Sequence, residues 1–135
     1  MVKLLIIADD FTGALDTGVQ FAASGAETRV VTNRDAVFED VEPGVQVLVL
    51  DAETRHLPAR EAYDVVFSVT RRACRSKIPY IYKKTDSALR GNVESELKAV
   101  LEGTKQPVLH FFPAFPKMNR ITRGGVHYID GVPAE

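Results

Sequence analysis

The sequence has one cysteine and no excess of charge of either sign, and each shortage excludes a class of protein. Cys74 has no partner for an internal disulfide, so a reducing cytoplasm is the expected location. The 17 Lys and Arg residues balance 18 Asp and Glu residues. No overall field therefore attracts nucleic acid or a membrane surface, and we expect neither as a partner.

Long apolar runs are also missing. The apolar stretch of residues 1–8 is interrupted by Asp9 and Asp10 well before it could span a bilayer or complete a signal peptide. We therefore expect neither a membrane anchor nor a secretory leader in this sequence.

The common motifs for nucleotide and metal binding are absent from the sequence. It contains neither the glycine-rich loop ending in Gly-Lys-Ser/Thr that cradles phosphates nor the Gly-x-Gly-x-x-Gly turn of dinucleotide-binding folds. The His and Cys residues do not have zinc-ligand spacing, and there is no Gly-x-Ser-x-Gly nucleophile elbow. We therefore expect no cofactor-binding or metal site within this chain.

Apolar segments that favour strands alternate with segments that have helical periodicity. Continuous β-favouring runs predict strands at residues 3–8, 28–32, 45–50, 80–82 and 108–112. The polar, acidic segment 33–44 is expected to be a loop. Such alternation predicts an α/β fold, an open and mostly parallel sheet covered by helices on both faces. At 135 residues, the chain is expected to form a single domain.

Helices are predicted after the first, third and fourth strands, each with one apolar face. The expected inward-facing residues are Leu15, Val19 and Ala22 in the first, Ala62, Val65 or Val66, Val69 and Ala73 in the second, and Val93, Leu97 and Val100 in the third. The expected boundary residues are Pro58 in the first turn of the second helix, Asn92 as the cap of the third, and Gly25 and Gly103 at helix ends.

The last residues carry a different signal. Asp130 and Gly131 form a turn dipeptide between short β-favouring flanks, so residues 125–133 predict a C-terminal β-hairpin. His127 is either an ordinary residue of this hairpin or a ligand contact. The chain then stops where a further element would be expected, and we expect it to be part of a longer protein.

Polar side chains follow the predicted strands at the points where the strands end. The first strand is followed by Asp9 and Asp10, the third by residues 51–55, and the fourth by residues 83–92. Residues 113–116, leading to Arg120 and Thr122, follow the last strand. Ligands of open α/β sheets bind beyond the carboxyl ends of the strands, so we expect a binding site at this edge.

The charged residues of these loops suit an anionic ligand that carries hydroxyl groups. A guanidinium offers two-point hydrogen bonding to a carboxylate, so Arg55 and Arg90 are candidate clamps, and Lys84 adds a point charge. Lys83 comes directly before it, and one of the two lysines is expected to point away from the site, because successive strand side chains alternate. Of the two adjacent acids, one is expected to cap the next helix while the other, Asp10, faces the ligand.

Four blocks of sequence carry a family resemblance. They are IADDFTGALDTG (residues 7–18), DAETR (51–55), KKTDSALRGN (83–92), and PAFP (113–116) followed by GVHYIDGVP (125–133). In order and spacing they resemble the N-terminal domain of the four-carbon acid-sugar kinases, a family long described as a domain of unknown function. The sequence departs from the usual pattern at Phe11, Ala52, Ala88 and Asn119. The change at Ala88 bears on the exact substrate more than on the class, while Asn119 can keep the turn because asparagine tolerates left-handed backbone.

The resemblance implies that the whole protein uses ATP and Mg²⁺ to phosphorylate the terminal hydroxyl of threonate, erythronate or a 3-oxo-tetronate. It also implies a second, C-terminal domain that binds the nucleotide. Together with the charges above, it implies that Arg55, with Lys84 or Arg90, holds the substrate carboxylate. Asp10 is the candidate catalytic residue. The full set of expected substrate-binding residues is Asp10, Arg55, Lys84, Asp86, Ser87 and Arg90.

Two other functions fit parts of the sequence. A phosphate-accepting receiver domain has similar length, paired acids after its first strand and an acceptor aspartate that would correspond to Asp51. The Lys-Pro expected after its last strand is replaced here by PAFP at 113–116. A non-catalytic sugar-acid-binding module is the third possibility. A homo-oligomer is a possible assembly for any of them, since an exposed apolar face would favour self-association.

Overall fold

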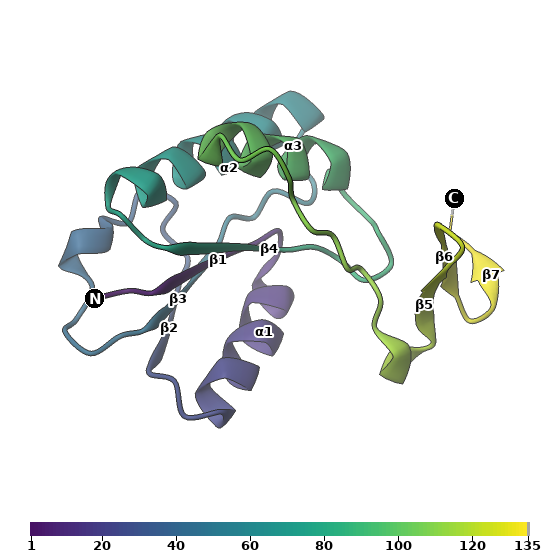
Figure 1. The fold of residues 1–135 in the computed structure, drawn as a ribbon, viewed down its shortest axis with the longest axis horizontal. Helices are drawn as coiled ribbons and strands as arrows, with labels where there is room; N and C mark the ends of the chain where they lie inside the picture. Colours follow the sequence, from purple (N-terminus) through teal and green to yellow (C-terminus); the bar gives the residue numbers. More distant parts are fainter. Residues whose placement is uncertain (135) are drawn as a thin grey trace.

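The computed structural model describes residues 1–134, which form a parallel sheet with helices on both faces and a small second sheet (Figure 1). The main sheet has four strands in the order β2-β3-β1-β4. Their bounds are β1 Leu4–Ala8, β2 Thr28–Val31, β3 Val47–Asp51 and β4 Tyr80–Lys84. All three strand pairings are parallel, as predicted.

Helices cover the two faces of this sheet unequally. Helix α1 (Phe11–Ala23) lies on one face, and helices α2 (Ala59–Arg75) and α3 (Val93–Thr104) lie together on the other (Figure 1). Leu5 and Ile7 point toward α2 and α3, while Ile6 points toward α1, and none of these side chains is exposed. Burying each contributes roughly 1.5–3 kcal/mol. The predicted α/β architecture is therefore confirmed.

The predicted inward face of α1 is wrong. The residues of α1 that are buried are small, namely Gly13, Ala14, Thr17 and Gly18, whereas Leu15 and Val19 are largely exposed. A Cβ atom at Gly18 would lie 3.3 Å from Val30 Cγ2, so the backbone of α1 approaches the sheet closely at this point. Small residues permit this close packing, and a search for large apolar residues at helical spacing passes over them.

Helix α3 also differs from its prediction. Glu96, Ala99, Val100 and Gly103 form its buried face, so of the predicted inward-facing residues only Val100 is buried. Gly103 lies inside the helix, which ends instead at Lys105 in a left-handed conformation. A Cβ atom at Gly103 would lie 2.7 Å from Thr70 Cγ2, which shows that glycine is needed for the contact between α2 and α3.

Residues 108–112, the fifth predicted strand, do not join the sheet. They run as an extended connector from α3 toward the small sheet (Figure 1). Val108 and Phe112 are exposed, and Leu109 alone in this segment packs against the main core. Strand propensity reflects how well a side chain fits a pleated, half-buried surface, and this segment has no such surface beside it.

The C-terminal hairpin prediction is confirmed and was incomplete. Strands β5 (Arg120–Arg123), β6 (Val126–Ile129) and β7 (Val132–Pro133) form an antiparallel sheet in that order, so β5 adds one strand to the expected pair. Asp130 and Gly131 both have positive φ, as the tight turn between β6 and β7 requires. Short 3-10 turns occur at Phe38–Asp40 and Pro116–Met118. Within residues 1–134, no helix is long and apolar enough to cross a membrane.

Candidate functional site

The carboxyl ends of β1, β3 and β4 meet at one edge of the main sheet. Ala8 pairs with Asp51 on one side and with Lys84 on the other. The loops that follow these strands therefore begin side by side. This parallel register is why segments far apart in sequence, at residues 9–10, 51–55 and 83–92, contribute to one site.

Arg55 joins the two adjacent aspartates. Its Nε donates to Asp9 Oδ2 at 2.8 Å, and its Nη1 donates to Asp10 Oδ2 at 2.6 Å. The side chains of Arg55 and Asp9 are only 12% and 4% exposed. Burial lowers the pKa of Arg55, but the hydrogen bond and the charge of Asp9 outweigh it and raise that pKa overall. Arg55 thus pairs with two carboxylates of its own chain, and its Nη2 has no hydrogen-bond partner among residues 1–134.

Asp10, the acid expected to face the ligand, also caps the next helix, a role expected of the other acid. Its Oδ1 accepts the backbone N–H of Gly13 at 2.8 Å and so caps α1, while its Oδ2 takes Arg55. Asp9 is the buried member of the pair, so the expected division between a capping acid and a ligand-facing acid is wrong. Each oxygen of Asp10 still has a second lone pair, and its side chain is 25% exposed.

The two adjacent lysines of β4 point to opposite faces, as predicted. Lys83 Nζ lies 2.6 Å from Glu96 Oε2, and both side chains are 2% exposed. Burial lowers the pKa of Lys83, and the charge of Glu96 partly offsets this. Lys84 Nζ lies beside the first turn of α1, 3.5 Å from the place where a Cβ of Gly13 would stand. Lys84 is therefore the lysine on the site side.

The loop between β4 and α3 is organised by Asp86. Both oxygens of Asp86 accept from Arg90, with Nε at 2.6 Å and Nη2 at 3.1 Å. Burial would raise the pKa of Asp86, but these bonds and the charge of Arg90 outweigh it and lower it to about 2. Arg90 remains 66% exposed on its outer side. The two residues expected to bind substrate are thus paired with each other.

The same loop is fixed to the loop after β3 by Gly91 and Asn92. Gly91 has φ +86, and a Cβ there would lie 3.2 Å from the Arg55 carbonyl oxygen. Asn92 was expected to cap α3, but its side chain makes no cap bond. Its amide instead donates to the carbonyls of Thr54 and Leu57, at 3.0 and 2.8 Å. Asn92 is therefore the N-cap residue of α3 by position, as predicted, but its amide satisfies a neighbouring loop rather than its own helix.

Ser87 connects the loop to the small sheet. Its hydroxyl accepts Arg120 Nη1, and its carbonyl oxygen lies 2.7 Å from His127 Nε2. His127 Nδ1 lies 3.0 Å from Thr122 Oγ1. The sequence indicated polar residues here but gave no reason to connect Arg120 with Ser87, because the link crosses 33 positions of sequence.

Asp51 lies at the end of β3 and is 1% exposed. Burial raises the pKa of Asp51 to about 6, and its Oδ1 accepts the backbone N–H of Glu53 at 3.1 Å. A receiver domain needs an acceptor carboxylate that a phosphodonor can reach. The burial of Asp51 does not suit that function.

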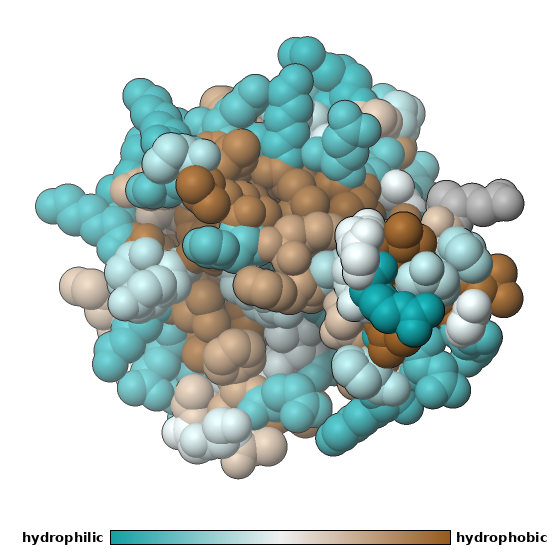
Figure 2. Space-filling model, turned by 45° about the vertical axis from the view of Figure 1, so that its right-hand side comes forward, coloured by the Kyte–Doolittle hydropathy of each residue, from teal (hydrophilic) through white to brown (hydrophobic). Residues whose placement is uncertain are grey.

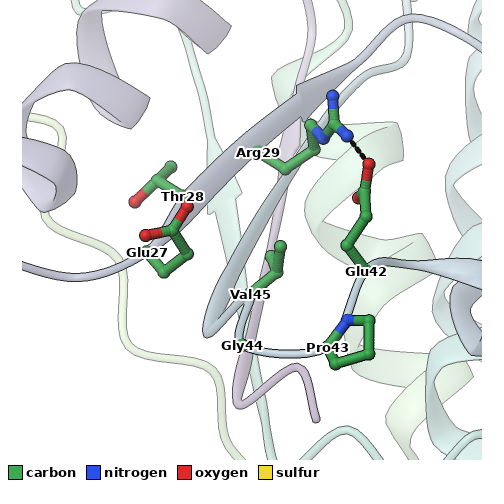
Figure 3. A pocket seen from close by; sticks show the side chains of 7 residues that line it. All are labelled: Glu27, Thr28, Arg29, Glu42, Pro43, Gly44 and Val45. Carbon is green, nitrogen blue, oxygen red and sulfur yellow. Dashed lines mark ion pairs between the residues drawn. The ribbon is translucent and has the colours of Figure 1, made fainter.

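Two surface hollows lie away from this edge of the sheet. The larger is lined by Glu27, Thr28, Arg29, Glu42, Pro43, Gly44 and Val45, near the amino ends of β2 and β3, and the Arg29–Glu42 ion pair crosses it (Figure 3). The other is lined by Asn119, Ile121, Asp130 and Gly131. Neither hollow includes a residue of the carboxyl-edge cluster.

The fold and this cluster together define a class of protein. It is a parallel α/β domain whose carboxyl edge gathers a lysine, two arginines and carboxylates. Within that class, the chain belongs to the family described as the sugar-binding N-terminal domain, whose model matches residues 4–135. The resemblance read from the four sequence blocks is confirmed, and no match supports a receiver domain.

Related proteins agree with this assignment. The chain is 36% identical to a D-threonate kinase of Salmonella typhimurium over 98% of its own length and 31% of that protein. It is 34% identical to a D-erythronate kinase of Heliobacterium modesticaldum, over 100% of this chain and 31% of the relative. A domain of unknown function from Bordetella bronchiseptica, solved as a domain-swapped dimer with bound citrate, matches at 32% identity and TM-score 0.92, over 98% of this chain and 35% of that one. The chain thus spans about a third of the length of these relatives.

Proposed function

We propose that this chain is the acid-sugar-binding domain of an ATP-dependent kinase that phosphorylates the terminal hydroxyl of a four-carbon sugar acid. Threonate, erythronate and 3-oxo-tetronate are the candidate substrates. The main support is the match of residues 4–135 to a sugar-binding N-terminal domain, together with relatives named D-threonate and D-erythronate kinases. Residues 1–135 would then form one domain of a longer enzyme.

The cations at the carboxyl edge suit the carboxylate of such a substrate. Lys84 has no carboxylate partner among residues 1–134 and is the cation best placed to receive the substrate carboxylate. Arg55 would donate a further hydrogen bond to this carboxylate from its remaining Nη2. The exposed face of Arg90, held by Asp86, would supply a third cation. The citrate bound to the Bordetella bronchiseptica relative is also a small hydroxy acid, which agrees with this ligand class.

Asp10 is proposed to accept hydrogen bonds from the substrate hydroxyls and to be the catalytic residue. Its carboxylate is oriented by Gly13 and Arg55, so little reorganisation is needed when a hydroxyl binds. Phosphoryl transfer requires mainly positioning and charge neutralisation from the protein. A carboxylate fixed in this way can also take the proton from the attacking hydroxyl.

ATP and Mg²⁺ are proposed to bind chiefly to the remainder of the whole enzyme. Within residues 1–134, no group of three or more His, Cys, Asp or Glu side chains is arranged to hold a metal ion. The sequence also lacks the common phosphate cradles. The part assigned to this chain is therefore to bind and orient the sugar acid.

Calorimetric titration with D-threonate and D-erythronate tests this function. We expect binding of at least one acid and no binding of the corresponding neutral polyol, because the lysine and arginines recognise the carboxylate. Lys84→Gln should weaken binding about tenfold or more, the effect of losing one charged hydrogen bond. The control Lys98→Gln alters an exposed lysine of α3 and should have no effect. Equal heats for the acid and the polyol would contradict the proposal.

A further inference from the structure

The small sheet presents three polar side chains to the loop between β4 and α3. Thr122 and His127 are directly opposite each other in the pairing of β5 and β6, and Arg120 lies two residues before Thr122 on the same face. Arg120 contacts the Ser87 hydroxyl, and His127 contacts the Ser87 carbonyl. Ser87 is therefore held at two points by residues far away in sequence.

The bonding at His127 is directional. The Ser87 carbonyl can only accept, so His127 Nε2 must carry the hydrogen of the 2.7 Å bond. In the neutral ring, Nδ1 is then an acceptor, and Thr122 Oγ1 can donate to it at 3.0 Å. His127 is 7% exposed, so water competes little for these bonds. The side chain thus has one orientation that satisfies both of its nitrogens.

The loop is held from its other side by the main domain. Gly91 packs against Arg55, and Asn92 donates to the carbonyls of Thr54 and Leu57. Asp86 comes directly before the attachment at Ser87, Arg90 lies between the two attachments, and the two side chains pair with each other. The position of this charged pair therefore depends on both the main domain and the small sheet.

We propose that Arg120 and His127 are positioning residues that hold the Asp86–Arg90 pair in its binding geometry by clamping Ser87. The proposal rests on the proposed function for its effect on sugar-acid binding. In this proposal the hydroxyl and the carbonyl of Ser87 bind the small sheet, and the ligand contacts the neighbouring Asp86 and Arg90. In this proposal the small sheet is part of the site, because it positions the loop between β4 and α3.

Hydrogen exchange on the 135-residue chain tests the clamp without any ligand. The backbone N–H groups of Leu89 and Arg90 are bonded to Asp86 and report on loop order. The double variant Arg120→Ala/His127→Leu should raise their exchange rates about tenfold or more, as expected for the loss of two partly buried hydrogen bonds, one of them charged. Exchange in β3 should be unchanged. If exchange in β3 also becomes faster, the double variant has loosened the whole fold, and the single variant His127→Leu replaces it in the experiment.

Matched variants separate positioning from simple stability. His127→Gln keeps an N–H donor for the Ser87 carbonyl and should retain slow exchange and acid binding, whereas His127→Leu should lose both. Arg123→Ala is the control on the same strand, since Arg123 stacks on Tyr128 on the other side of the small sheet. Unchanged exchange at Leu89 and Arg90 in the double variant would overturn the clamp.

Affinity gives the second measurement. We expect the double variant to bind the sugar acid about tenfold more weakly and the control variant to bind normally. If loop exchange rises but affinity is unchanged, the clamp orders the loop without serving the site, which refutes the positioning role. If the unaltered chain binds no acid at all, the proposed function fails, and the exchange experiment still decides whether Ser87 is clamped.

Discussion

Asp9 is a buried carboxylate whose charge is balanced by one side chain, Arg55. Its Oδ2 accepts a hydrogen bond from Arg55 Nε, while its Oδ1 is buried without a hydrogen-bond partner among residues 1–134. Leaving a buried charge without its ion-pair partner is costly, and among residues 1–134 the ion pair of Asp9 is made with Arg55. Arg55 therefore has a structural task as well as the ligand-binding task predicted from the sequence.

We predict that Arg55→Ala lowers the free energy of unfolding by about 3 kcal/mol, because Asp9 remains buried without its counter-ion. Urea denaturation measures this directly. Arg60→Ala removes an exposed ion pair with Asp64 and should change stability by no more than about 0.5 kcal/mol. Equal stability of the two variants would show that Asp9 does not depend on Arg55. Binding by Arg55→Ala should be interpreted only where the protein is folded.

Asp51 gives a pH-dependent prediction opposite in sign to that of an ion-paired acid such as Asp86, whose pKa is lowered. Its folded pKa, about 6, lies above the ordinary value near 3.8, because burial disfavours the charged form. The native state therefore binds the proton more tightly, and Asp51 stabilises the fold below pH 4. That contribution is lost as the pH rises from about 4 through 6.

The variant Asp51→Asn should remove this dependence while keeping an oxygen for the Glu53 N–H. Allowing for solvent screening, we expect the variant to be about 1 kcal/mol more stable than the unaltered chain at pH 7.5 and about equal to it at pH 4. Urea denaturation at both values measures the difference. A stability difference that does not change with pH would contradict the raised pKa.

The packing of α2 against α3 depends on a small residue at their contact. At the interface of α2 and α3, Gly103 lies against Thr70, whose branched side chain is fully buried. We predict that Gly103→Ala lowers the free energy of unfolding by about 1–3 kcal/mol, since overpacking outweighs the better helix propensity of alanine. Thermal unfolding measures it. Lys98→Ala, at an exposed position of the same helix, should leave the melting temperature nearly unchanged.

The elements that could be predicted from the sequence are those with a single dominant signal. Continuous apolar runs predicted β1 and β3 because a strand buried on both faces has no polar alternation to obscure it. The faces of α1 and α3 could not be predicted, because Gly18 and Glu96 are buried through partners on other elements: a valine of β2 for the first and Lys83 for the second. Residues satisfied by distant partners carry no local pattern.

The candidate site followed the same rule. The loops after β1, β3 and β4 begin at one edge as predicted, because parallel strands bring their carboxyl ends together. The fourth predicted loop, residues 113–116, does not follow a strand of this sheet, because residues 108–112 form no strand. The pairings within the site were not predicted: Asp10 both caps α1 and binds Arg55, and Asp86 is paired with Arg90. Direct contact of a substrate with Asp10, Arg55, Lys84, Asp86, Ser87 or Arg90 stays a prediction.

Several large apolar side chains are exposed on the surface of the molecule. Figure 2 shows apolar side chains gathered across the middle of one face. Tyr80 and Phe112 are 68% and 84% exposed. Contiguous apolar surface of this kind favours association between proteins.

We therefore predict that the chain self-associates as its concentration rises. Sedimentation velocity should show an increasing mean mass, and Phe112→Ser should shift the distribution toward the monomer by removing the most exposed phenylalanine. Glu94→Ser, at an exposed polar position of α3, is the matched control and should leave the distribution as it is. A concentration-independent monomer would contradict the prediction.

The central claim is that a four-carbon sugar acid binds at the carboxyl edge of the main sheet. Nuclear magnetic resonance titration with D-threonate tests it most directly, because backbone amide shifts locate the ligand. We predict that the largest shifts occur at Gly13, Arg55 and residues 84–90. Shifts concentrated at the hollow of residues 27–29 and 42–45, or no shifts with either threonate or erythronate, would contradict the account.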